Sequence, residues 1–317
     1  MNDYMKAVTY RFPEHIPVKV GLLPATWAKY GKDLQKLCLK HPNIFQNVAN
    51  TEEVRYFTPP SYHAGKFTDA WGCVWENINE GYESIVTGHP VPNREDVWNL
   101  KVPEEDIGTP HGFMYLRLLD LRGFEEMMVD FAEEPEELQH LIDIVRDYNI
   151  RQTEIIVKNS PDQDLIVFGD DNGLQHSLPI RPETWRKYIK PAYKAIFDVV
   201  HKADKLVYMH TDGCIWQVIP DFTEIGVNVI NPQIRANGLG HLVDTCKGKV
   251  CIDLDLDRQL FPFATPKQIE SHIEECVKAL YMPEGGLMLS AECAADVPFE
   301  IIEAICDTFE KVRNYKG

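Results

Sequence analysis

The chain has 317 residues, of which 44% are hydrophobic and 26% are charged, a composition typical of a globular protein with ample material for a core. Its 49 acidic residues outnumber its 32 basic residues and give a formal net charge of -17. Because such a surface repels phosphate backbones and anionic headgroups, we expect the protein to bind neither nucleic acid nor membrane surfaces.

The cysteines and the N-terminal residues indicate the cellular compartment of the protein. Eight cysteines are scattered along the chain without a CxxC pair. No run approaches the ~20 apolar residues that span a bilayer, and the first residues, "MNDYMKAVTYRFPEHIP", lack the apolar core of a signal peptide. We therefore expect a cytoplasmic protein whose cysteines are reduced and mostly buried.

Residues 1–110 are irregular and rich in aromatic residues, proline and glycine. Long segments of this kind are usually functional, so we expect an N-terminal extension that forms a lid or an oligomer contact. Within it, "TDAWGCVWEN" (68–77) carries Asp69 and Trp71. An aromatic lid suits a flat ligand, although a hydrophobic plug that closes a barrel would show the same pattern.

From residue 111 to residue 317 the pattern becomes regular, and we expect the whole chain to form one domain. After two helices that break at Pro135, short apolar strands alternate with helices. The expected strands are 164–171, 205–213, 227–234, 249–257 and 285–293. This alternation predicts a parallel sheet covered by helices. No GxGxxG or GxxxxGK[ST] follows a strand, which argues against a nucleotide-binding open sheet. The sequence therefore predicts an α/β fold, a (β/α)8 TIM barrel.

Polar side chains gather where these strands end. In a (β/α)8 barrel the carboxyl ends of the strands converge on one mouth, where active sites lie. The candidate site residues are Asp170, Asp171, His210, Asp212, Asn231, Gln233, Asp257, Glu292 and Cys293.

His210 and Asp212 lie two positions apart at a strand end, so their side chains point the same way. With Cys293 they would supply a nitrogen, an oxygen and a thiolate, a set that suits Zn²⁺ with one position open for substrate. The same pattern is consistent with a histidine hydrogen-bonded to a nearby aspartate and a separately buried cysteine. Cys214, close to a helix start, is either a rival thiolate or a small packed residue.

Two adjacent carboxylates, Asp170 and Asp171, follow the first of these strands. In a pocket such neighbours can have separate pKa values and act as an acid or a base. A turn with a helix-capping aspartate is the alternative. Asn231 and Gln233 are neutral hydrogen-bonding residues suited to orienting a substrate, and Asp257 is the exposed carboxylate at the end of "DLDLD".

Several segments together resemble the uroporphyrinogen decarboxylase superfamily. They are "TDAWGCVWEN", "FGDDNG…RPETWRKYIKP", "HTDG…IPDFTEIGVNVINP", "GKV…DLDRQ" and "DVPFEIIEAI", in the same order and spacing over about residues 55–310. The resemblance is closest to the corrinoid-dependent methyltransferases, including methyltransferase components of bacterial O-demethylases. The Arg-rich N-terminal segment of true decarboxylases has no counterpart here.

This resemblance implies a zinc site. Relatives that activate a thiol use His-x-Cys after one strand and a cysteine after the last strand. Here the first motif becomes His210-Thr211-Asp212, and the last cysteine matches Cys293. An oxygen ligand in place of a thiolate makes the metal a stronger Lewis acid, which suits an ether oxygen better than a thiol.

The implied reaction moves a methyl group from a small methyl ether, aromatic or otherwise, to the cobalt of a corrinoid. The chain lacks the DxHxxG motif that binds cobalamin, so the resemblance implies a separate corrinoid protein as partner. Asp170, Asp171, Tyr208 and Gln233 would orient the substrate or donate a proton, and the aromatic lid with Trp71 would cover the ring. Pairing of superfamily barrels makes a homodimer a reasonable expectation.

Two other functions stay open at this point. The first is a metal-free lyase of the uroporphyrinogen decarboxylase type, in which Asp69 would be the central carboxylate that stabilises a protonated pyrrole. The second is a non-catalytic barrel that binds or protects a corrinoid. The sequence does not specify the methyl donor or its acceptor.

Overall fold

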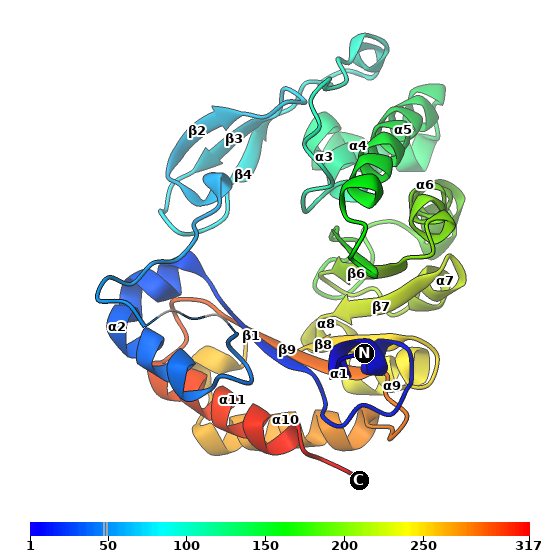
Figure 1. Cartoon of the computed structure of the whole chain (residues 1–317). Coiled ribbons are helices and arrows are strands. Elements are labelled where there is room, and N and C mark those ends of the chain that lie inside the picture. Colours follow the sequence, from blue (N-terminus) through cyan, green and yellow to red (C-terminus); the bar gives the residue numbers. More distant parts are fainter. Residues whose placement is uncertain (47, 49) are drawn as a thin grey trace. The chain divides into compact units, whose positions relative to one another are not determined.

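The computed structural model spans residues 1–317 and describes all of them except residues 47 and 49. The chain divides into two compact units. Unit 1 consists of Met1–Ala64, Asn77–Ser84 and Pro232–Gly317, and unit 2 consists of Gly65–Glu76 and Ile85–Asn231. Unit 1 therefore contains both chain ends (Figure 1).

Unit 1 is built on three neighbouring strands in the order β1, β9, β8. They are β1 (Val18–Leu22), β8 (Cys251–Asp255) and β9 (Leu287–Cys293), and β9 pairs in parallel with both neighbours. Its helices are α1 (Asp3–Val8), α2 (Pro24–Lys40), α8 (Ile234–Asn237), α9 (Leu239–Cys246), α10 (Pro266–Leu280) and α11 (Phe299–Val312), with 3-10 turns η1 (Pro60–Tyr62) and η3 (Phe261–Phe263). Both β8 and β9 are buried along nearly their whole length, because parallel strands are covered on both faces.

The helix α10 shows how the sequence fixes its own start. The Thr265 hydroxyl accepts the Gln268 N–H, and the Gln268 side chain accepts the Thr265 N–H, which together form a capping box. Pro266 occupies the first turn, where its missing N–H costs nothing. The apolar face of α10 packs along α11 (Figure 1).

Unit 2 contains three further strands in the order β7, β6, β5. They are β5 (Leu165–Gly169), β6 (Leu206–Thr211) and β7 (Val227–Pro232), and β5 pairs in parallel with β6 so that Gly169 lies opposite His210. The helices are α3 (Tyr115–Arg122), α4 (Phe124–Glu133), α5 (Glu136–Asn159), α6 (Pro182–Lys202) and α7 (Ile219–Glu224), with the 3-10 turn η2 (Arg94–Asn99). A separate sheet has the order β2 (Gly65–Thr68), β3 (Val74–Asn77), β4 (Ile85–Gly88).

An aromatic core anchors β5 to α6. Phe168 on β5 lies 5.2 Å from Phe197, and Tyr193 stacks on Phe197 with 5.7 Å between ring centroids. Trp185, in an earlier turn of α6, meets Phe222 of α7 edge-on at 5.1 Å. Aromatic pairs at these separations add to the stabilisation that comes from buried area alone. The end of β5 that follows Phe168 is therefore held firmly against α6.

The α/β class and all five expected strands are present, but the closed eight-stranded barrel is not confirmed. Among the described residues, the larger of the two sheets has six strands, three from each unit. The first 110 residues are also more regular than expected, because they contain α1, β1, α2 and the β2–β4 sheet. β1 was not predicted because it lies in a segment without clear periodicity. A single domain over 1–317 stays a prediction.

Among the residues that the structure describes, no helix has both the length and the apolar character needed to cross a membrane.

Two loops of unit 2 run backbone against backbone after β5 and β6. The Gly173 N–H donates to the Asp212 carbonyl, and the Cys214 N–H donates to the Leu174 carbonyl. A Cβ on Gly173 would lie 2.4 Å from the Cys214 nitrogen, and one on Gly213 would lie 2.2 Å from the Gly173 carbonyl carbon. Gly213 also has φ +83°, a conformation that favours glycine. Only glycine at both positions permits this crossing.

We predict that Gly213→Ala lowers the free energy of unfolding by about 2–4 kcal/mol, through backbone strain and the close approach to Gly173. Urea denaturation monitored by circular dichroism measures the change. Gly240→Ala is the matched control, because a Cβ there meets no heavy atom within 4 Å; its change should not exceed about 1 kcal/mol. Equal stability of the two variants would contradict the backbone crossing.

Candidate functional site

His210, near the end of β6, has a fixed orientation and tautomer. Its Nδ1 lies 2.7 Å from the Asn231 side-chain oxygen at the end of β7. Because an amide oxygen only accepts, Nδ1 must carry a hydrogen and donate, so in the neutral ring the lone pair is on Nε2. Asn231, which the sequence predicts to bind substrate, therefore acts on His210 and holds its ring.

The Nε2 atom of His210 faces two carboxylates. It lies 3.4 Å from Asp212 Oδ1 and 3.9 Å from Asp171 Oδ1. The two acidic residues are themselves joined, because the Asp212 backbone N–H donates to Asp171 Oδ1 at 3.0 Å. With a neutral ring, Nε2 and the two carboxylates are three acceptors around one point, which repel one another unless a proton or a metal ion lies between them. The arrangement therefore attracts a cation.

A second histidine, His111, completes this group and was not found from the sequence. Its Nε2 lies 3.3 Å from Asp171 Oδ2, so the two oxygens of Asp171 face two different imidazoles. One ligand atom from each of His111, Asp171 and His210 lies within 4.8 Å of the others. His111 comes from the loop before α3 and not from a strand end, and a lone histidine in "TPHGF" gives no signal of its own.

The end of β5 leaves space for the His111 ring. A Cβ on Gly169 would lie 2.7 Å from His111 Nδ1, closer than any real carbon contact. The Gly112 N–H donates to the Gly169 carbonyl at 2.8 Å, which fixes the loop that carries the histidine. Glycine at the last position of β5 is thus a requirement for this placement.

Asp171 is the ionised member of the adjacent pair. Burial acts to raise its pKa, but the hydrogen bond from His111, the His111 charge and the Asp212 N–H together outweigh burial. The pKa of Asp171 therefore lies below its usual value. A carboxylate with a lowered pKa between two imidazoles suits cation binding better than proton donation.

Asp170, its neighbour, has a different role. It is fully buried, and its carboxylate accepts N–H bonds from Met114, Tyr115 and Leu116 at the start of α3. The Tyr193 hydroxyl donates to it as well, at 2.6 Å. Burial raises the pKa of Asp170 to about 6. This is the helix-capping role that the sequence left open for one of the pair, and it favours a structural function over the predicted catalytic one.

Asp69, the other predicted catalytic carboxylate, anchors its own loop. Oδ1 accepts the backbone N–H groups of Trp71 and Cys73. Oδ2 accepts the indole N–H of Trp75 at 3.0 Å and pairs with the Arg117 guanidinium of α3 at 2.6 Å. With both oxygens occupied, Asp69 ties the aromatic loop to α3.

Two aromatic residues that the sequence assigns to substrate binding are buried. Trp71 is only 4% exposed, and its ring meets Tyr148 of α5 edge-on at 4.8 Å. Tyr208 of β6 is also 4% exposed. The position of Trp71 fits the alternative of a packed plug better than that of an open lid. Contact of either ring with a substrate stays a prediction.

Beside the Asp69 loop lies a half-buried acid, Asp120, that sequence reasoning did not single out. Its Oδ2 is 3.7 Å from Arg117 Nη1. Burial raises the pKa of Asp120 to about 7, although the Arg117 charge opposes this rise. The available signal was an aspartate between two arginines in the leucine-rich run "LRLLDLRGF".

The strand ends of unit 1 carry the remaining predicted residues. Gln233 forms an isolated bridge with Asp255, and Asp257 accepts a bond from Arg235 at 2.7 Å. Arg258 pairs with Asp255 at 2.9 Å and with Glu292 at 2.6 Å. A cavity of about 640 Å³ opens here. It is lined by Gln233, Arg235, Arg258, Gln259, Pro262, Phe263, Glu292, Ala294, Asp296 and Val297.

Cys293, the last residue of β9, is fully buried in unit 1. Burial, followed by the charges of Glu292 and Asp255, raises the pKa of its thiol well above the usual value. A metal would therefore have to displace the thiol proton. His210 belongs to unit 2, so a metal shared by these two residues stays a prediction. Cys214 is buried too, with a raised pKa, which favours a packing role.

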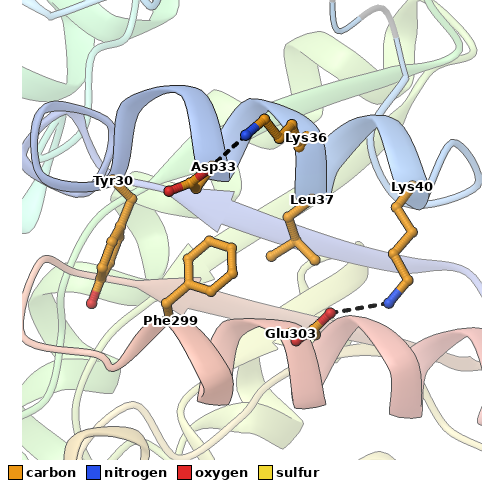
Figure 2. A pocket seen from close by; sticks show the side chains of 7 residues that line it. All are labelled: Tyr30, Asp33, Lys36, Leu37, Lys40, Phe299 and Glu303. Atoms are coloured by element: carbon orange, nitrogen blue, oxygen red, sulfur yellow. Dashed lines mark hydrogen bonds and ion pairs between the residues drawn. The ribbon is translucent and has the colours of Figure 1, made fainter.

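Another cavity, of about 510 Å³, lies between α2 and α11 of unit 1 (Figure 2). Tyr30, Leu37 and Phe299 form apolar parts of its wall. Lys40 pairs across it with Glu303 at 3.1 Å. The described residues that line this cavity all belong to these two helices, and none of them is a predicted site residue.

Residues 118–312, more than half of the chain, match the family uroporphyrinogen decarboxylase (URO-D). The chain belongs to the URO-D family. The match covers β5 to β9 and so includes His111's partners Asp171 and His210. The resemblance that the sequence motifs indicated is thus confirmed.

Solved structures agree with this assignment. A methyltransferase from Methanosarcina mazei superposes with a TM-score of 0.64 at 15% identity, over 98% of this chain and 97% of that one. At that identity the likeness shows that the URO-D protein shares its fold. A fungal beta-1,4-galactanase structure reaches a TM-score of 0.34 at 11% identity over 54% of this chain and 70% of that one, which is too slight to carry an argument. No curated protein matches the chain.

We predict that Asp170→Ala lowers the unfolding free energy of this URO-D protein by at least about 3 kcal/mol, because it removes the acceptor of three backbone N–H groups and a buried hydrogen bond from Tyr193. Urea denaturation measures the loss. The exposed Asp162→Ala is the control and should change stability by less than about 0.5 kcal/mol. An Asp170→Ala protein as stable as wild type would contradict the capping role.

We further predict that Asp120→Asn becomes more stable relative to wild type as the pH rises. The folded-state pKa of about 7 exceeds the unfolded value of 3.8, so the folded protein holds the proton more tightly. The stabilisation from that proton is fully present below the unfolded value and is lost as pH rises toward 7. Asparagine avoids the loss. The difference in unfolding free energy between the variant and wild type should therefore shift by about 1–3 kcal/mol in favour of the variant from about pH 5 to about pH 8.

Urea denaturation at both pH values tests this prediction for Asp120. Asp162→Asn, which removes one exposed charge, controls for a general charge effect. A stability difference between Asp120→Asn and wild type that is the same at both pH values would contradict it.

Proposed function

We propose that this URO-D family protein is a zinc-dependent methyltransferase that moves a methyl group from a small methyl ether to the cobalt of a corrinoid carried by a separate protein. The observation that carries the proposal is His210, whose ring is fixed by Asn231 so that Nε2 faces Asp171 and Asp212. Membership of the URO-D family and a fold shared with a methyltransferase support it.

The donor atoms around His210 fit zinc. Imidazole nitrogens and carboxylate oxygens are ordinary zinc ligands. Bonds of about 2.0–2.2 Å in tetrahedral geometry place ligand atoms roughly 3.3–3.6 Å apart, and the distances from Asp212 and Asp171 to Nε2 are 3.4 and 3.9 Å. When bound, zinc supplies a Lewis acid that polarises the ether oxygen. The sequence proposes Asp212 and Cys293 as the further ligands.

The chain's own residues would then have separate tasks. Asn231 keeps the hydrogen of His210 on Nδ1, so that Nε2 remains a ligand. Asp171, whose pKa is lowered, stays negative and offsets the charge of a cation. Gln233 and its neighbours line a cavity whose volume falls in the usual range for small-ligand sites, about 300–1,000 Å³. We propose that Gln233 and Asp257 orient the substrate.

The corrinoid partner follows from the resemblance and not from a surface of this chain. Methyl transfer breaks a carbon–oxygen bond and leaves both bonding electrons on oxygen, while Co(I) supplies the electron pair of the new carbon–cobalt bond. The departing alkoxide then takes a proton from solvent. Binding of a homodimer partner is a further expectation of the resemblance.

A metal-free lyase has less support. It would need Asp69 as a central carboxylate, but Trp75, Arg117 and two backbone N–H groups already occupy both of its oxygens. Turnover of a porphyrinogen by the purified protein would revive this alternative.

We predict that the purified protein holds about one zinc per chain and that His210→Ala loses it. Zinc is measured by inductively coupled plasma mass spectrometry. Methyl transfer is measured as methylcobalamin formation from free cob(I)alamin with a panel of methoxyarenes and small aliphatic methyl ethers. His210→Ala should lower that rate at least about 100-fold, and Asn231→Ala should weaken zinc binding about 10–100-fold.

His176→Ala is the matched control, since His176 is an exposed histidine of the loop after β5. Wild-type protein that contains no zinc, together with full methyl transfer by His210→Ala, would refute the proposed function.

A further inference from the structure

A three-ligand cation site can be assembled inside unit 2 alone. We propose that His111 Nε2, one carboxylate oxygen of Asp171 and His210 Nε2 hold a divalent ion of the zinc class, and that Cys293 is not required for its binding. This inference rests on the metal dependence in the proposed function and names different ligands for the same metal. His111 has no place in the ligand set that the sequence motifs imply.

The distances support this set. His111 Nε2 lies 3.3 Å from Asp171 Oδ2, and His210 Nε2 lies 3.9 Å from Asp171 Oδ1. The three ligand atoms all lie within 4.8 Å of one another. A tetrahedral ion with bonds of about 2.0–2.2 Å needs separations of roughly 3.3–3.6 Å. Small rotations of the two rings would therefore bring all three atoms to one centre.

Two of the three ligands are each held by a bond to a neighbour outside the set. His210 donates from Nδ1 to Asn231, which turns Nε2 inward. Asp171 accepts the Asp212 N–H on Oδ1, which fixes the plane of its carboxylate. Metal-binding histidines commonly donate their second ring hydrogen to such an acceptor, and this sets both tautomer and orientation. His210 and Asp171 are thus oriented before any ion binds.

Gly169 leaves the space that the third ligand, His111, occupies. A side chain at position 169 would meet the His111 ring at 2.7 Å and would push it away from Asp171. The Gly173–Gly213 crossing keeps the Asp171 loop against the loop that follows His210. Small residues here therefore place donor atoms from three separate segments around one point.

Two imidazoles and one carboxylate leave a coordination position open. Catalytic zinc sites combine three protein ligands with such a position, whereas structural sites are closed. Without a thiolate the ion keeps more of its positive charge and binds hard oxygen more strongly than sulfur. The site would therefore favour an ether or alcohol oxygen of the substrate over a thiol, and the nearby Asp212 carboxylate adds negative charge that retains the ion.

The test compares metal binding by variants that separate the two ligand sets. Full-length wild type, His111→Ala, Gly169→Ala and Cys293→Ser are stripped of metal and titrated with Zn²⁺ by equilibrium dialysis. They are then loaded with Co²⁺ for absorption spectroscopy. His176→Ala and Gly240→Ala are matched controls for a histidine and a glycine, and circular dichroism checks that each variant is folded.

We expect His111→Ala to weaken zinc binding at least about 100-fold, and Gly169→Ala, which removes no donor, to weaken it about 10–100-fold. Cys293→Ser and both controls should bind like wild type. The cobalt spectrum of wild type should show ligand-field bands of a nitrogen and oxygen set. It should lack the near-ultraviolet thiolate-to-cobalt band that a cysteine ligand produces.

The opposite pattern overturns the inference. If Cys293→Ser loses the metal and the thiolate band while folded His111→Ala retains both, the metal uses the cysteine and the proposed function still stands. If wild type binds no metal, both proposals fail. If the His111 and Gly169 variants lose metal as expected but wild type transfers no methyl group, the site is confirmed and the proposed function fails.

Discussion

The candidate site depends on one constraint, the contact of two loop backbones at Gly173 and Gly213 in unit 2. No residue with a Cβ could occupy either position without displacing the other loop. The contact brings the segment after β5 against the segment after β6, so Asp171 accepts the Asp212 N–H and both carboxylates come to the same ring, that of His210. Without this contact, the His210 ring and the carboxylates of Asp171 and Asp212 would move apart.

Electrostatics then gives adjacent residues different roles. Asp170 and Asp171 share a strand end, but one points into the core and binds the start of α3 while the other faces two histidines. Burial raises the pKa of the first to about 6, and hydrogen bonds lower that of the second. Alternation along an extended chain is sufficient to produce this division, since neighbouring side chains point to opposite sides.

Sequence reasoning found what strand periodicity encodes. The five strands after residue 111 and the strand-end position of His210 follow from apolar runs that end in polar residues. It could not choose between Asp170 and Asp171, because that choice depends on which side of β5 faces the core. It missed His111, which reaches the site from a loop, and it could not show that Asn231 holds a histidine. The short β1 lay in a segment without clear periodicity.

The peptide bond between Asp170 and Asp171 has a mechanical consequence. One carboxylate accepts hydrogen bonds from the first turn of a buried helix, and the other, only one residue further on, faces the proposed position of an ion. The strand end cannot swing outward without exposing the amides of that turn, so its opening is coupled to local unfolding of α3. Slow exchange of those amides with solvent would accordingly report how rigidly the ion's ligands are held.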